Sequence, residues 1–159
     1  MYLAKRWCCV VTVLTVMGTI NAVAAPHKSS AHPNAQAPHG RLGFSKRSHF
    51  TEVLTTPKGC LSSTDVRGAL KLIGKHGAFS GVVASIFIPR NGTGYFYIDF
   101  NKQWKLAISA AVDTNLAASF PDLRTLLHRK VVIVGVFSRY GADHPQIILK
   151  SLDQIHLLK

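Results

Sequence analysis

The residues FSGVVASIFI at positions 79–88 and GYFYIDF at positions 94–100 decide the fold of this chain. Both stretches are rich in β-branched and aromatic residues, which favour β-strands. The residues between them, PRNGT, are typical of a hairpin loop. The sequence therefore predicts two antiparallel strands joined by a short connection, with a bend in the first strand at Gly81.

Three further strands and a helical connector follow this hairpin. Residues 104–112, 130–140 and 146–149 are also apolar or β-branched runs, and we expect each to form a strand. Residues 113–127 are rich in Ala and Leu, and Asp122 is placed to restart a helix there. Five strands with a helical connector between the third and the fourth describe the OB-fold, a small Greek-key barrel. We therefore expect a mostly β, five-stranded OB-fold Greek-key barrel.

Both ends of the barrel sequence carry short amphipathic segments. Apolar residues recur at helical spacing over residues 66–73, which predicts an N-terminal helix capped by Ser63 or Thr64. The tail, residues 152–158, offers three apolar side chains that we expect to dock onto the domain. The alternative folds are an open sandwich and a ferredoxin-like sheet, but the latter needs a helix directly after its first strand, where none is predicted.

Residues 1–24 contain the three parts of a secretory signal peptide. Lys5 and Arg6 precede an uncharged run of fourteen residues, and small residues follow up to Ala24. A membrane-spanning helix needs about 20 apolar residues, so we expect a cleaved leader and no stable membrane anchor. The predicted cleavage site lies between Ala24 and Ala25, and the mature protein is expected to be periplasmic or secreted.

The chain is strongly basic. Its 159 residues include 19 Lys and Arg against 7 Asp and Glu, a formal charge of +12 that becomes +10 once Lys5 and Arg6 are removed. Such an excess predicts an acidic partner, either nucleic acid or another polyanion such as anionic lipid or an acidic polymer. Cys60 is the only cysteine of the mature chain, so no internal disulfide is expected.

Residues 25–59 are poor in large apolar residues and rich in Pro, His, Ser and basic residues. This composition cannot bury enough surface to offset its ordering entropy, so we expect a disordered basic Pro- and His-rich arm ahead of an OB-fold domain at residues 60–159. The spacing of the four histidines in the arm matches no compact metal site. We therefore expect neither a metal ion nor a cofactor.

Residues 64–158 resemble the small exported bacterial OB-fold proteins that are related to the nucleic-acid-binding barrel of tRNA-anticodon domains. In those relatives an acidic residue often follows the proline of the last loop, where this chain has Gln146. The resemblance implies an OB barrel that binds a ligand. The matching pieces are Gly81-Val82-Val83, Tyr97-Ile98-Asp99-Phe100, Val131-Val132-Ile133-Val134-Gly135, Arg139-Tyr140, Pro145-Gln146-Ile147-Ile148-Leu149 and Gln154-Ile155.

OB barrels bind ligands on the exposed face of strands two and three and through the loops that join strands one to two and four to five. Strand alternation places Phe96, Ile98 and Phe100 in the core and the intervening residues outside. Aromatic rings interleaved with cations suit single-stranded nucleic acid, because bases stack on rings while phosphates meet positive charge. The predicted nucleic-acid-binding residues are Tyr95, Tyr97, Trp104, Lys102, Lys105, Arg90, Arg139 and Tyr140.

Each of these residues also has a structural interpretation. Exposed tyrosines suit any strand, and Trp104 could cap the barrel end instead of binding a ligand. Asp99 falls on the same side as the tyrosines, where its charge would repel phosphate.

The sequence lacks clustered catalytic groups. Calcium-assisted nucleases need grouped carboxylates and a Glu base, whereas Glu52 falls in the predicted arm and the six aspartates are scattered. His128 and His144 are single loop histidines that we expect to be exposed. The sequence therefore predicts an exported, non-enzymatic protein that binds single-stranded nucleic acid. The alternatives are a periplasmic envelope adaptor for a protein or an anionic polymer, and a nuclease.

Overall fold

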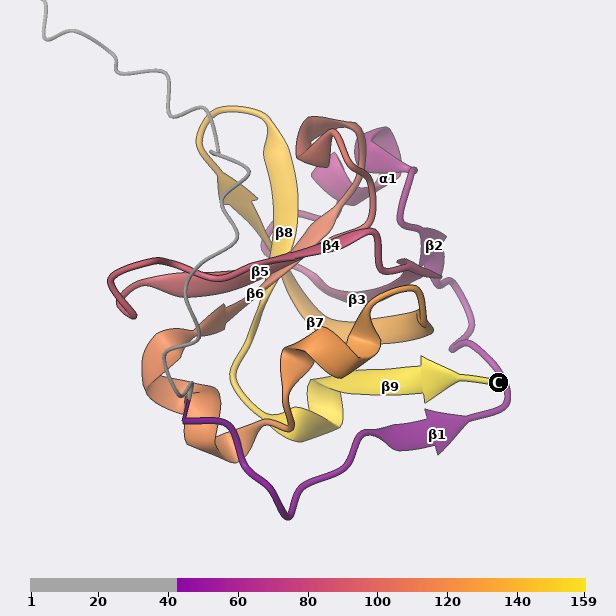
Figure 1. The fold of residues 1–159 in the computed structure, drawn as a ribbon. Coiled ribbons are helices and arrows are strands. Elements are labelled where there is room, and N and C mark those ends of the chain that lie inside the picture. The colour runs from indigo at the N-terminus through magenta and orange to yellow at the C-terminus, as the bar shows by residue number, and fades with distance from the viewer. Residues whose placement is uncertain (1–42) are drawn as a thin grey trace, which may run out of the picture. The chain divides into compact units, whose positions relative to one another are not determined.

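The structure is a computed structural model, and it describes residues 43–159 (Figure 1). The predicted signal peptide, its cleavage site between Ala24 and Ala25, and residues 25–42 of the predicted arm lie outside the described residues. All described residues belong to one compact unit. No helix in residues 43–159 has the length and apolar character needed to cross a membrane.

The described chain is mostly β-strand, with few short helices. The strands are β1 (Thr51–Val53), β2 (Leu61–Ser62), β3 (His76–Val82), β4 (Ser85–Phe87), β5 (Tyr95–Asp99), β6 (Ser109–Asp113), β7 (Lys130–Tyr140), β8 (His144–Leu149) and β9 (Ile155–Leu158). The α-helix is α1 (Val66–Leu70), and the 3₁₀ helices are η1 (Trp104–Leu106), η2 (Thr114–Ser119), η3 (Leu123–Leu126) and η4 (Leu152–Gln154).

The strands form one strongly curled sheet (Figure 1). Seven of them follow the order β1-β9-β7-β8-β6-β5-β4, while β3 pairs with β7 and with β2. The pairs β6–β8, β1–β9 and β2–β3 are parallel, and the other pairs are antiparallel. The predicted strands at 94–100, 130–140 and 146–149 are confirmed as β5, β7 and β8, and β8 begins two residues earlier than predicted.

The predicted first strand, residues 79–88, is interrupted instead of continuous. The Val83 N–H donates to the Arg129 carbonyl at 3.0 Å, and the Ala84 N–H donates to the Asp99 carbonyl at 2.8 Å. These two residues separate β3, which pairs with β7, from β4, which pairs with β5. One stretch of chain therefore pairs with two different strands, and the sheet curls between them.

The predicted hairpin between the first two strands is confirmed. β4 and β5 are antiparallel, and Phe87 lies directly opposite Tyr97. The loop closes with a hydrogen bond from the Gly92 N–H to the Pro89 carbonyl at 3.1 Å. Gly94, directly before β5, has a φ of +96°, a backbone conformation that glycine adopts without steric cost.

The prediction that a third strand begins at Trp104 is wrong. Residues 104–106 form η1, and β6 begins only at Ser109. The Asn101 side chain accepts a hydrogen bond from the Gln103 N–H at 2.9 Å, which holds the chain in a turn. Ile108 then donates its N–H to the Ser63 carbonyl at 2.7 Å before the strand starts.

The helical segments are shorter than predicted. α1 has five residues and is capped by Asp65, which accepts a hydrogen bond from the Gly68 N–H at 2.8 Å, so neither Ser63 nor Thr64 is the cap. The connector between β6 and β7 holds two 3₁₀ helices, η2 and η3. Asp122 caps η3 as predicted, accepting from the Arg124 N–H at 3.0 Å.

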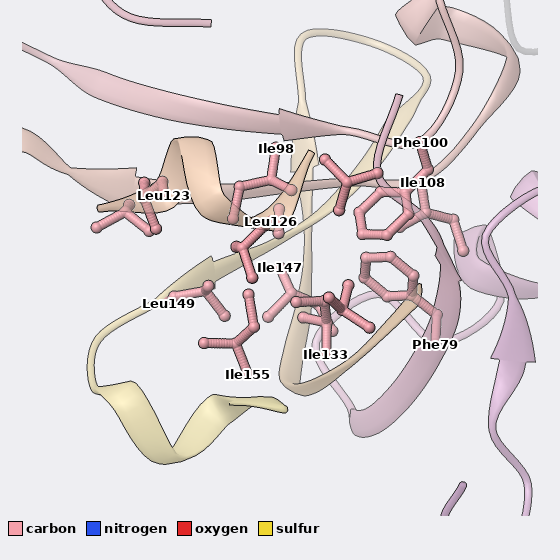
Figure 2. Packing of buried hydrophobic residues seen from close by; sticks show 14 of the residues in the cluster. Phe79, Ile98, Phe100, Ile108, Leu123, Leu126, Ile133, Ile147, Leu149 and Ile155 are labelled. Carbon is pink, nitrogen blue, oxygen red and sulfur yellow. The ribbon is translucent and has the colours of Figure 1, made fainter. Parts of the chain in front are cut away.

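The core lies inside the curl of the sheet (Figure 2). Phe96, Ile98 and Phe100 are all buried, so the predicted alternation of β5 is confirmed. The Phe79 ring packs edge-to-face on Phe100, with 5.0 Å between the ring centroids. Core residues from separate elements include Ile108, Leu123, Leu126, Ile133, Ile147, Leu149 and Ile155.

The structure differs from the expected disordered arm over residues 43–59. Residues 51–53 form β1, which pairs with β9 in the tail. The Phe44 ring lies 5.1 Å from the Phe96 ring, and Phe50 also packs against the core. A three-residue strand is too short for a hydrophobic period, so the ordered segment before residue 60 had no sequence signal.

Close packing explains the glycine in the middle of β7. A Cβ atom built on Gly135 would lie 2.7 Å from Ile147 Cγ2 and 2.7 Å from Gln154 Nε2. Ile147 is fully buried, and Gln154 Nε2 donates to the Val134 carbonyl at 3.1 Å. Neither atom can move away without a loss of packing or of that hydrogen bond.

We expect Gly135→Ala to lower the free energy of unfolding by about 1–3 kcal/mol through overpacking, as measured by urea denaturation. Gly43→Ala is the matched control, because no atom lies within 4 Å of a Cβ built there. Equal stability of the two variants would contradict the packing role of Gly135.

Candidate functional site on the outer face of the sheet

Six rings form a continuous row on the face of the sheet opposite the core. We call them the ring row: Phe87, Tyr95, Tyr97, Tyr140, Trp104 and His144. The centroid distances are 6.1 Å from Phe87 to Tyr97, 6.3 Å from Tyr95 to Tyr97 and 5.9 Å from Tyr97 to Tyr140. Trp104 continues the row, at 5.9 Å from Tyr140 and 4.7 Å from His144.

Strand register brings the rings of the row together. Phe87 and Tyr97 are directly opposite each other in the β4–β5 pair, and Tyr140 and His144 are opposite each other at the end of the β7–β8 pair. Trp104 comes from η1, in the connection that follows β5. The ring contact between Tyr97 and Tyr140 shows that the end of β7 lies beside β5. The curl of the sheet brings the two strands together.

All five ring contacts along the row are tilted or edge-to-face. The interplanar angles are 65° between Tyr97 and Tyr140, 73° between Tyr140 and Trp104, and 78° between Trp104 and His144. Each such contact contributes about 0.5–1.5 kcal/mol beyond area burial. The row is therefore held together by its own rings, and half-buried side chains such as Tyr95 and Tyr97 keep part of their surface exposed.

A chain of polar side chains lies within the same face. Ser109 Oγ donates to Asp99 Oδ1 at 2.8 Å, and His144 Nε2 lies 3.0 Å from Ser109 Oγ. We call these three residues the polar chain; their exposed fractions are 9% for Asp99, 2% for Ser109 and 7% for His144. Buried polar groups that hydrogen-bond to one another rigidify the structure around them.

Two expectations about this face need correction. The prediction that His144 is an exposed loop residue is wrong, because His144 begins β8 and packs against Trp104. Asp99 does lie on the tyrosine side of β5, but it is buried and hydrogen-bonded to Ser109. Its carboxylate is therefore not displayed on the surface between the tyrosines. His128 is exposed, as predicted.

The predicted cations are placed unevenly around the row. Lys105 Nζ lies 5.5 Å from the centroid of the Trp104 ring, so it joins the row through a cation–π contact. Lys102 and Arg90 are exposed in loops next to β5. Arg139 is exposed as well, but neighbouring residues of a strand point to opposite faces. Alternation along β7 gives Arg139 and Tyr140 different directions, so the expectation that Arg139 extends the groove together with Tyr140 stays a prediction.

Positive charge dominates the described surface. Within residues 43–159, the ion pairs of Lys and Arg are Arg124–Asp122 and Lys159–Glu52, each at 2.5 Å. Neither pair includes a cation near the ring row. In the same part of the chain, no three His, Cys, Asp or Glu side chains are grouped so that they could hold a metal ion.

The sequence interpretation missed Phe87 and His144 as members of the row. The hairpin loop offered a signal for Phe87, because the register it sets places Phe87 opposite Tyr97. A signal for His144 was also present. Ile147 and Leu149 face the core, so alternation continued toward the start of the fifth strand places His144 on the opposite face, with the rings. Ser109 carried no such signal, because its role depends on two partners from other strands.

The environment of the row alters the acidity of its central tyrosine. Burial raises the pKa of Tyr97 above its ordinary value of 10.0, and nearby Tyr140, Tyr95 and Asp99 raise it further. The folded state therefore favours the neutral phenol. This preference stabilises the fold below the unfolded-state pKa and is lost as the pH rises through the folded-state pKa.

We expect the free energy of unfolding of the wild-type protein to fall more steeply above about pH 10 than that of Tyr97→Phe, which has no phenol to ionise. Urea denaturation followed at several pH values across this range measures the difference. Parallel curves for the two proteins would contradict a raised pKa for Tyr97.

The chain matches no protein-family model, and no curated protein is significantly similar to it. A function for this face is therefore inferred from its own features: the ring row, the polar chain within it and the cations around it.

Proposed function

We propose that this chain is an exported, non-enzymatic OB-fold protein that binds single-stranded nucleic acid through the ring row. The observation that carries the proposal is the contiguity of the rings, which come from β4, β5, η1, β7 and β8 and form one row on the face away from the core. The proposal has three parts: the OB-fold, the ring row as the binding surface, and the cations around the row. Separate observations support each part.

The order of strand pairing supports the OB-fold. If β3 and β4 are counted as one interrupted strand, that strand pairs with β5 and with β7. β5 pairs with β6, β6 pairs in parallel with β8, and β8 pairs with β7. A five-stranded Greek-key barrel with a helical connector between its third and fourth strands has this order.

The chemistry of the ring row supports a nucleic-acid ligand. Stacking of a base on an aromatic ring contributes about 1–3 kcal/mol per base and tolerates any sequence, because every base has a π face. Tyr95 and Tyr97 are half-buried, so their rings are anchored while part of each remains accessible. Several rings in a row could therefore take successive bases of one strand.

The charge around the row supports a polyanionic ligand. Lys105 lies against Trp104, and Lys102 and Arg90 are exposed in the adjoining loops. The sheet register places two carboxylates on this face. Asp99 is buried and hydrogen-bonded within the polar chain, and Asp113, directly opposite Tyr95, accepts a hydrogen bond from the Asn115 N–H at 2.8 Å. Phosphates along the row would therefore meet ammonium and guanidinium groups at its edges.

We expect the wild-type protein to bind a labelled single-stranded DNA of about 12 nucleotides, as measured by fluorescence anisotropy. Its affinity should fall roughly tenfold or more between about 50 and 200 mM salt, because bound phosphates release counterions. Absence of binding at low salt, or binding that does not depend on salt, would reject the proposal.

The double variant Tyr95→Ala/Tyr97→Ala should lose at least about tenfold in affinity, because two stacking rings are removed. Tyr95→Phe/Tyr97→Phe is the matched control and should bind like the wild type, since it keeps both rings. Thermal unfolding of each variant separates loss of binding from loss of fold. Equal affinities of the two folded variants would reject the stacking role and favour the envelope adaptor, which recognises a protein or an anionic polymer by charge.

A further inference from the structure

The polar chain connects three strands beneath one end of the ring row. Asp99 is the last residue of β5, Ser109 is the first residue of β6, and His144 is the first residue of β8. In the sheet register, Asp99 lies directly opposite Ser109, so their side chains share one face. Ser109 is the middle member, with Asp99 Oδ1 on one side and His144 Nε2 on the other.

With Asp99 ionised, the donors and acceptors of these three side chains give one order for the protons. An ionised carboxylate can only accept hydrogen bonds, so Ser109 donates its one hydroxyl proton to Asp99. The Ser109 oxygen then has only lone pairs to offer to the imidazole. His144 must therefore donate from Nε2, which at neutral charge specifies the Nε2–H tautomer. The carboxylate thus orients the imidazole through a hydroxyl group.

The His144 ring is in direct contact with the next ring of the row. Trp104 packs edge-to-face on this imidazole at 4.7 Å, and Tyr140 packs on Trp104 at 5.9 Å. A rotated imidazole would present a different edge to Trp104. Trp104 belongs to a three-residue 3₁₀ helix that has no side-chain cap hydrogen bond, so few local contacts other than those of its ring hold it in place.

We propose that Ser109 is a positioning residue for the ring row: its hydroxyl, anchored on Asp99, locks the His144 ring, which in turn sets the position of Trp104. Ser109 itself touches no ligand, because it is almost completely buried. The effect on ligand affinity rests on the proposed function, whereas the tautomer and orientation of His144 do not.

The first experiment observes the imidazole of His144 in the full chain by ¹H–¹⁵N NMR without a ligand. We expect a slowly exchanging, hydrogen-bonded Nε2–H signal in the wild type, and we expect it to disappear in Ser109→Ala. Ser138→Ala is the matched control. Ser138 is a part-buried serine on β7, and its hydroxyl donates to the Gln146 carbonyl at 3.3 Å instead of contacting His144. A wild-type imidazole protonated only at Nδ1 would overturn the proposal.

The second experiment measures oligonucleotide affinity for the same variants. Ser109→Ala should bind about tenfold more weakly than the wild type, the size expected for one buried hydrogen bond. Ser138→Ala should be unchanged, and Ser109→Thr, which keeps the hydroxyl group, should recover both the Nε2–H signal and the affinity. Equal binding by Ser109→Ala and Ser138→Ala would overturn the positioning role.

The two experiments fail in different ways. If the wild type binds no oligonucleotide, the proposed function fails, and the NMR signal still decides whether Ser109 orients His144. If the wild type binds and the Nε2–H signal is absent, only the positioning role fails. Should Ser109→Ala not fold, the wild-type tautomer and the Ser109→Thr variant still test the inference.

Discussion

The interruption of the first strand at Val83 and Ala84 is the constraint on which the rest of the structure depends. Backbone hydrogen bonds to the Arg129 and Asp99 carbonyls hold these two residues outside the ladder. β3, before the interruption, pairs with β7, and β4, after it, pairs with β5. The sheet has to curl so that both pairs can form. Without that curl, Tyr140 at the end of β7 would not reach Tyr97 on β5, and the ring row would be divided in two.

The fold could be predicted where a strand carries its own pattern. β5 alternates buried and half-buried residues and β7 is a long β-branched run, so both follow from residue types alone. β1 and β9 have three and four residues. β1 pairs with β9, and β9 also pairs with β7, and local sequence does not specify these partners. η1 was missed because an Asn101 side-chain turn overrides the strand propensity of its residues.

The sequence predicted most of the aromatic rings of the candidate site, but it did not predict the burial of the site's polar groups. Tyr95, Tyr97 and Tyr140 were found from alternation and from their loops, and the structure brings their rings into one row. Burial of Asp99 and His144 could not be predicted, because residue type argues for exposure and only cross-strand partners offset the cost of desolvation.

The cation–π contact of Lys105 means that the free protein already occupies one side of Trp104 with a group of its own. In the proposed complex with single-stranded nucleic acid, a base that stacks on that side would first displace the ammonium, at the cost of a contact of about 0.5–1 kcal/mol. The displaced Lys105 is then free to meet the phosphate that arrives with the base. On the proposed function, the side of Trp104 that Lys105 covers would therefore accept a nucleotide more readily than an uncharged aromatic compound.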